Sequence, residues 1–215
     1  MPMRPELQQQ RDFLFQIYFG GNGDELDRFI SRAYRDLNRT FSGIGKLDNE
    51  LKTRILNGAK EELKKRVVTL SEDKDLSLDR FNAWHDSTCK ALKDYYDKSL
   101  NTVTKIRFTY GQAQKWVNMT MKYCWVCGGK KLDGLQQWFP MAHVPVDEVI
   151  LIAASEEKVV PNRPCVKWSK WENEQEYKDF QFTLRNAAAK KSKVPLELEF
   201  EWWEKYRPEL TKVDE

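Results

Sequence analysis

Apolar residues recur along most of the chain at the spacing of an α-helix. The clearest stripe has apolar side chains at positions i, i+3, i+4, i+7, i+8 and i+11, and comprises Leu26, Phe29, Ile30, Ala33, Tyr34 and Leu37. This periodicity is typical of an amphipathic helix with one buried face. The predicted helices span 5–19, 24–37, 51–67, 77–97, 108–128, 145–154, 172–191 and 195–206. The one alternating stretch, 194–200, is rich in Glu and Leu, which favour helix, so the pattern predicts an all-α fold.

Short polar, glycine-rich or proline-containing stretches separate the predicted helices. They lie at 20–23, 42–45, 71–77, 129–144 and 158–166. We find no internal repeat and no low-complexity tract. Apolar residues make up 40% of the chain and aromatic residues 13%, which is enough to build a packed interior. A chain of 215 residues falls within the range of one large domain, so we expect a single helical domain over 1–215.

The sequence favours an intracellular protein. We see no signal peptide at its start, and the longest apolar run, 149–154, is far too short to cross a bilayer. The four cysteines then read as reduced thiols. We therefore expect a cytoplasmic protein with no membrane partner.

The net charge of the chain neither indicates nor excludes a nucleic-acid partner. The formal net charge is +3, and a compact enzyme needs only a local basic face to hold phosphates. The densest basic clusters in the C-terminal half are 190–193 and 130–131. Each cluster taken alone reads as a solvated helix end or loop.

The segment 110–125 carries the most informative pattern. Its apolar stripe consists of Ala113, Trp116, Val117, Met121 and Cys124, which we expect to face the core. Lys115, Asn118 and Lys122 fall together on the opposite, polar side. Gly111 lies where the chain turns into this helix, and the free amides of a helix N-terminus form a natural phosphate site.

A second motif follows at His143-Val144-Pro145-Val146-Asp147. Pro145 suits the first turn of a helix. Asp147 would then lie in that first turn, where the helix dipole favours a carboxylate. An ionised Asp147, downstream of Lys115 at another helix start, is a candidate active-site pair.

These two segments resemble the helix-hairpin-helix DNA glycosylases, most closely the branch of endonuclease III and 8-oxoguanine DNA glycosylase. That family carries a Gly-x-Gly-x-Lys-x-x-Asn-like hairpin and helix, then Pro-Val-Asp-x-x-Val. This chain has Gly-Gln-Ala-Gln-Lys-Trp-Val-Asn at 111–118 and Pro-Val-Asp-Glu-Val-Ile at 145–150. The resemblance covers 108–152, about a fifth of the chain. Ala113 replaces the second hairpin glycine, and the interval between Lys115 and Asp147 is longer than usual.

The resemblance implies roles for individual residues. Lys115 matches the Schiff-base lysine and Asp147 the catalytic aspartate, while the turn around Gly111 matches the hairpin that grips a DNA phosphate. The implied DNA-contacting residues are Gly111, Gln112, Gln114, Asn118 and His143. The expected protein is a monomer on double-stranded DNA that uses no cofactor and binds no metal.

The implied chemistry begins with base flipping, because a base cannot be attacked inside the stack. Asp147 would stabilise positive charge that develops on the sugar. A neutral Lys115 would attack the sugar and add strand cleavage, whereas a protonated Lys115 would bind phosphate. The long interval between the two residues suggests an unusual substrate, and hypermodified cytosines of phage genomes are one hypothesis, which leaves repair and antiviral defence both open.

Two other classes of function remain open. The altered hairpin favours a non-catalytic DNA-binding protein on the same scaffold. The aromatic-rich C-terminus is the one pointer to a helical interaction protein. Cys124 and Cys127 have metal-ligand spacing, with His143 and Cys165 as possible partners, but buried thiols fit the apolar stripe better.

The insert between the two motifs contains Trp138 and Phe139. An exposed aromatic or Gln there could fill the gap that a flipped base leaves. Packing of both rings on the core is the favoured interpretation.

Overall fold

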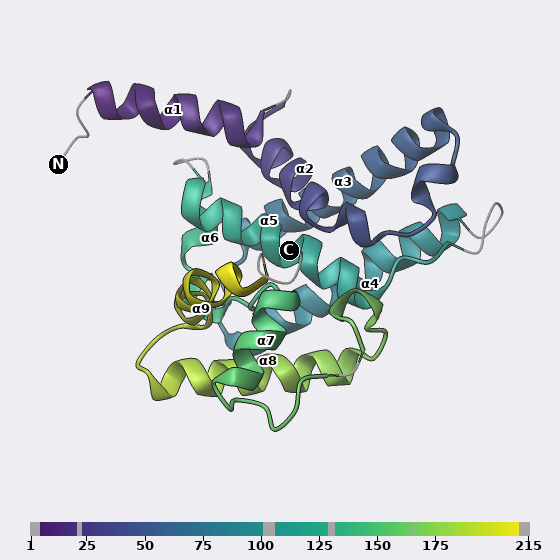
Figure 1. Ribbon diagram of the computed structural model, residues 1–215. Helices are drawn as coiled ribbons and strands as arrows, with labels where there is room; N and C mark the ends of the chain where they lie inside the picture. The colour runs from purple at the N-terminus through teal and green to yellow at the C-terminus, as the bar shows by residue number, and fades with distance from the viewer. Residues whose placement is uncertain (1–4, 21–22, 101–105, 129–131, 165, 211–215) are drawn as a thin grey trace.

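We analysed a computed structural model of the chain, which describes all residues except 1–4, 21–22, 101–105, 129–131, 165 and 211–215. All regular secondary structure within the described residues is helical, as the periodicity predicts (Figure 1). The α-helices are α1 (Pro5–Phe19), α2 (Glu25–Leu37), α3 (Asn49–Glu72), α4 (Leu78–Leu100), α5 (Tyr110–Cys127), α6 (Asp133–Gln136), α7 (Glu148–Glu156), α8 (Glu174–Lys190) and α9 (Pro195–Leu210). Short 3-10 turns lie at η1 (Asn38–Thr40), η2 (Ile44–Lys46), η4 (Phe139–Met141) and η5 (Trp168–Lys170). None of the described helices is both long and apolar enough to span a membrane.

Helix α5 forms the centre of the fold. It packs against α2, α4 and η5 (Figure 1), and residues on every side of it are buried, including Gln114, Asn118 and Thr120. The apolar stripe of α5 faces the core as predicted. Its polar side is also covered by protein, because α7, α8 and α9 are assembled over that side and their residues supply its partners.

The helix starts follow from local capping chemistry. Asp24 caps α2, since its side chain accepts a hydrogen bond from the Asp27 amide and the Asp27 side chain accepts one from the Asp24 amide. Thr109 and Gln112 form the same reciprocal box at the start of α5. The cap of α8 is Asn173, whereas Ser169 lies in the preceding 3-10 turn.

One helix boundary and one connecting segment differ from the sequence prediction near the site. Helix α7 begins at Glu148 with Asp147 as its cap, so Pro145 precedes the helix and Asp147 stands one step outside the first turn. The irregular stretch 129–144 contains α6 and η4, and Trp138 in it is fully buried with its indole N–H bonded to the Leu70 carbonyl. The packing interpretation of Trp138 is thereby confirmed, and Phe139 packs on Trp125.

Helix α1 differs from the others in its exposure. It extends away from the body at one edge of the molecule (Figure 1), and Phe13, Leu14 and Ile17 are exposed while Phe19 is buried. The apolar stripe predicted over 5–19 therefore joins the core only at the C-terminal end of this helix.

Candidate active site

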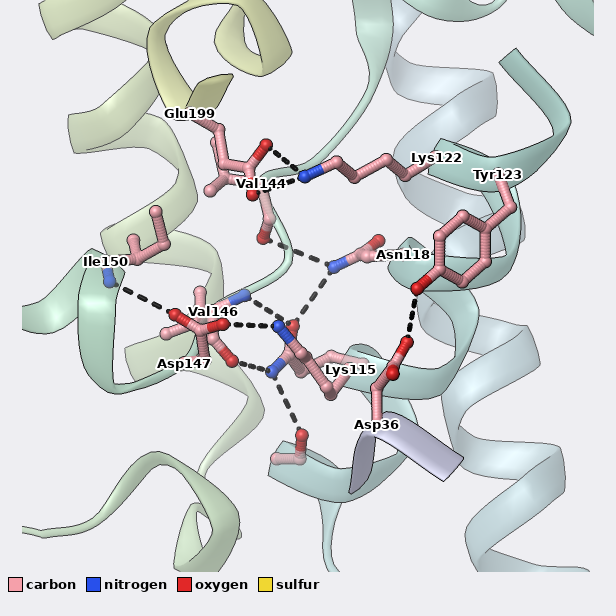
Figure 2. A network of polar contacts seen from close by, with 12 residues as sticks. Asp36, Lys115, Asn118, Lys122, Tyr123, Val144, Val146, Asp147, Ile150 and Glu199 are labelled. Carbon is pink, nitrogen blue, oxygen red and sulfur yellow. Dashed lines mark hydrogen bonds and ion pairs between the residues drawn. The ribbon is translucent and has the colours of Figure 1, made fainter. Parts of the chain in front are cut away.

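Lys115 and Asp147 form one buried ion pair. The Lys115 Nζ donates to Asp147 Oδ2 over 2.6 Å (Figure 2), and the two side chains are 5% and 14% exposed. Lys115 lies in the second turn of α5, so its Cα is fixed by the capping box below it and by the packing of α2 and α4. A buried pair of opposite charges loses most of its hydration, and its two members are then held by each other and by the hydrogen bonds around them.

Asp147 is held by its own helix as well as by Lys115. Its Oδ1 accepts the Ile150 amide over 3.2 Å, which is the N-cap bond of α7. This bond places the carboxylate at the N-terminal end of α7, where the first-turn amides point toward it. The carboxylate therefore presents one oxygen to its helix and the other to the amine.

A second buried ion pair lies farther along α5. Lys122 Nζ donates to both carboxylate oxygens of Glu199 over 2.7 and 2.6 Å (Figure 2), and the Glu199 side chain has no exposed surface. Burial raises the pKa of Glu199, and the charges of Lys122 and Lys115 lower it while Asp147 raises it further. The two ion pairs are thus electrostatically connected.

Glu199 is a residue that the sequence prediction missed. The buried residues of the last helix include Leu198, Glu199 and Trp202 as well as Leu196 and Tyr206. A signal for this was present, because Glu199 stands between two apolar residues and three positions after Leu196. An acidic residue on that face is compatible with burial only if a cation meets it.

Neutral polar groups connect the pairs to the rest of the core. The Asn118 amide donates to Gln114 Oε1 over 3.0 Å and to the Tyr177 hydroxyl over 2.9 Å. Gln114 in turn donates to the carbonyls of Gly111 and Val146 over 3.0 Å each. These bonds fix the chain just before Asp147. Asn118 and Gln114 are both buried, so they position the site from within the protein instead of facing solvent.

The start of α5 is occupied by protein groups. The Gly111 amide donates to the Trp171 carbonyl over 2.9 Å, and a Cβ at position 111 would lie 1.9 Å from the Trp168 carbonyl oxygen. Gln112 is buried and donates to the Thr40 carbonyl over 2.9 Å. Gly111 is therefore the second residue of a continuous helix against which η5 packs, and its amide already has a partner where we expected a hairpin that grips phosphate.

His143 is buried beside a second histidine. Its Nε2 lies 2.8 Å from Asn82 Oδ1 and its Nδ1 lies 3.1 Å from the Tyr177 hydroxyl, while the rings of His143 and His85 are 4.4 Å apart. Burial lowers the pKa of His85 to about 4 and that of His143 well below its usual range. Both rings therefore stay neutral at neutral pH, and the polar contacts of His143 are with other buried or half-buried side chains.

The expectation of buried thiols holds for Cys124 and only in part for Cys127. Cys124 is fully buried and Cys127 is half-buried, and burial raises the pKa of both thiols. Among the described residues, no group of three or more His, Cys, Asp or Glu side chains is arranged to hold a metal ion. Cys165, which we considered as a fourth ligand, lies outside the described residues.

Of the two predicted basic clusters, the structure describes the one at 190–193. In the cluster 190–193, Lys191 and Lys193 form ion pairs with Glu201, and Lys191 lies 3.6 Å from Glu157. The other predicted cluster, 130–131, lies outside the described residues. The C-terminal cluster is thus largely neutralised within the protein.

A scan against protein-family models found no match to this chain. Searches of curated proteins and of solved structures found no significant match either. No comparison therefore supports the resemblance to helix-hairpin-helix glycosylases, which stays an expectation from the sequence of 108–152.

Proposed function

We propose that this protein is a DNA glycosylase that cleaves the bond between a base and its deoxyribose. The observation that carries the proposal is the ion pair in which Lys115 Nζ meets Asp147 Oδ2 at 2.6 Å. These residues are 32 positions apart, and the resemblance assigned the amine and the carboxylate of the reaction to them. Their close contact supports the proposal, because both groups would have to act on the same sugar.

Each member of the pair has a defined task in this reaction. As the bond between C1′ and the base breaks, positive charge develops on the sugar, and the Asp147 carboxylate stabilises it. The Lys115 amine, once it has given its proton to the departing base, forms a bond to C1′ with its free electron pair. The C1′–O4′ bond then breaks and O4′ takes a proton from the new C1′-bound nitrogen, which opens the sugar ring and leaves an iminium ion between Lys115 and C1′. A hydride donor reduces this iminium ion to a stable amine.

The proposal requires that the site opens. With 5% of the Lys115 side chain exposed, a flipped nucleotide reaches the amine only if covering segments move apart. The segment 143–147 and α9 lie over this side of α5, and Glu199 of α9 is buried there. Closure around a reacting base excludes water, which strengthens the electrostatic effect of Asp147.

A second candidate function is DNA binding without cleavage. It is favoured by the start of α5, where the Gly111 amide and the Gln112 side chain are bonded to other parts of the protein. In this case the pair of Lys115 and Asp147 would serve to hold α7 on α5. The two candidates differ in whether a covalent or abasic product forms.

Borohydride trapping tests the proposal. The protein is incubated with duplexes that carry uracil, 8-oxoguanine, other common lesions or hypermodified cytosines, and the reduced adduct is measured by gel electrophoresis. Lys115→Gln and Asp147→Asn are compared with Lys122→Gln, which removes another ion-paired lysine from the same helix. Circular dichroism verifies that each variant is folded.

We expect an adduct that Lys115→Gln abolishes and that Lys122→Gln retains. Abasic sites without an adduct, lost in Asp147→Asn, would support base removal without strand cleavage. Absence of both products on every duplex, with the wild-type protein bound to DNA, would reject the glycosylase in favour of the second candidate.

A further inference from the structure

An open pocket of about 520 Å³ lies beside the start of α5. Three segments that are distant in the sequence form it: 40–46 after α2, 106–112 leading into α5, and 170–172 before α8. The base of the pocket is built by Thr109 and Gln112, whose side chains bond to the Ser169 and Thr40 carbonyls. The pocket wall is therefore held by the same bonds that fix the N-terminus of the helix bearing Lys115.

Three cationic side chains converge on this pocket. Lys46, Arg107 and Lys170 line it, and all three residues are exposed. None of them forms an ion pair with another residue in the described part of the chain, in contrast to Lys191 and Lys193. The lining also includes one acid, Glu172, whose carboxylate lies 3.7 Å from Lys93, so the pocket carries an excess of two positive charges.

Unpaired cations around a hollow are suited to an anionic group. Each of the three cations could exchange its hydration for charge-assisted hydrogen bonds to phosphate oxygens. Any two of these cations are at least 60 positions apart in the sequence. Folding therefore brings them to one pocket. A carboxylate ligand would meet fewer of these donors than a phosphate, which offers three or more oxygens.

We infer that the pocket lined by Lys46, Arg107 and Lys170 binds a phosphate group. Gln112 lines the pocket and Lys115 follows three residues later on α5. The pocket therefore adjoins the first turn of the helix that carries the proposed nucleophile. The DNA-backbone version of this inference rests on the proposed function, whereas a free phosphorylated small molecule would use the same side chains.

The test combines two probes with a variant of the pocket and a control variant outside it. Binding of a fluorescent 20-base-pair duplex is measured by anisotropy over a range of salt concentrations, and binding of inorganic pyrophosphate is measured by calorimetry. The pocket variant is Lys46→Gln/Arg107→Gln/Lys170→Gln. The control is Lys74→Gln, which removes an exposed lysine just beyond the opposite end of the 24-residue helix α3, roughly 36 Å from its start.

We expect the pocket variant to weaken duplex binding by roughly tenfold or more and to lower the salt slope of log K by about 1, while Lys74→Gln changes neither. A loss confined to the duplex identifies the DNA backbone as the source, and a loss confined to pyrophosphate identifies a small phosphorylated molecule. Equal binding of both probes by the pocket variant and Lys74→Gln would overturn the inference. Excision chemistry is read out separately by trapping, so a failure of the pocket and a failure of the glycosylase are distinguishable.

Discussion

The amine of Lys115 and the carboxylate of Asp147 meet within the protein at 2.6 Å, although 32 positions separate them. The same carboxylate caps α7 through the Ile150 amide. One residue thus joins the central helix to the helix that follows the insert. This contact is the centre of the proposed site, and it also makes the site a contributor to stability.

Removal of one charge from the pair should destabilise the fold. In Lys115→Met the Asp147 carboxylate stays buried without its cation, and we expect a loss of roughly 3 kcal/mol in the free energy of unfolding. Urea denaturation followed by circular dichroism measures it. The double variant Lys115→Met/Asp147→Asn keeps a capping oxygen and removes both charges, so it should recover most of the loss. A double variant no more stable than the single one would show that the charge pairing is not the cause.

The close packing of η5 on α5 should make Gly111 intolerant of a side chain. Gly111→Ala would place a Cβ 1.9 Å from the Trp168 carbonyl oxygen, a backbone atom that cannot move aside without moving η5. We expect a loss of about 3 kcal/mol, at the upper end for overpacking. Gly45→Ala is the matched control, because a Cβ there meets nothing within 4 Å. Thermal denaturation of both variants measures the difference, and equal melting temperatures would contradict the packing argument.

The buried histidines should make stability fall at mildly acidic pH. The pKa of His85 is about 4 in the folded protein against about 6.5 in the unfolded chain, so the unfolded state binds more protons between these values. Stability is therefore full above pH 6.5 and declines as the pH falls toward 4. His85 alone should contribute a loss of about 2 kcal/mol between pH 7 and pH 5.

The histidine prediction is checked by unfolding wild type and His85→Gln at both pH values. The variant carries no titrating ring at this position, so its loss between pH 7 and pH 5 should be smaller than that of wild type. His143 still titrates in the variant and keeps part of the dependence. An identical pH dependence in the two proteins would show that His85 is not the titrating group.

The second ion pair should behave differently from the first when it is broken. In Lys122→Met the fully buried Glu199 loses the cation that lowers its pKa, so its pKa, already raised by burial, rises further. A folded-state pKa above the unfolded value means that stability is lost as the pH rises through it. Lys122→Met should therefore lose roughly 3 kcal/mol at neutral pH and less at pH 5.

The added substitution Glu199→Gln supplies the control for this prediction. The double variant Lys122→Met/Glu199→Gln has no buried carboxyl to titrate at this position, so its deficit relative to wild type should not shrink toward pH 5. Urea denaturation at pH 5 and pH 8 separates the two outcomes. A deficit in Lys122→Met that is independent of pH would exclude an ionising Glu199 as its cause.

The sequence by itself determined the helices and much of their capping. The spacing of apolar residues predicted each long helix, because burial of one helical face repeats every three to four positions whatever the neighbours are. Asp24 was identifiable as a cap for the same local reason. The pairing of Lys115 with Asp147 was anticipated from the order of the two motifs.

Only the tertiary structure decided which polar residues are buried and which cations stay unpaired. Lys115, Asn118 and Lys122 were predicted on a polar side of α5, but α7, α8 and α9 cover that side and supply Asp147, Tyr177 and Glu199 as partners. The pocket is assembled from segments far apart in the chain. The periodicity of a helix shows which of its faces is apolar and which is polar. Whether the polar face is buried depends on the partners that folding brings to it, and these partners lie far away in the sequence.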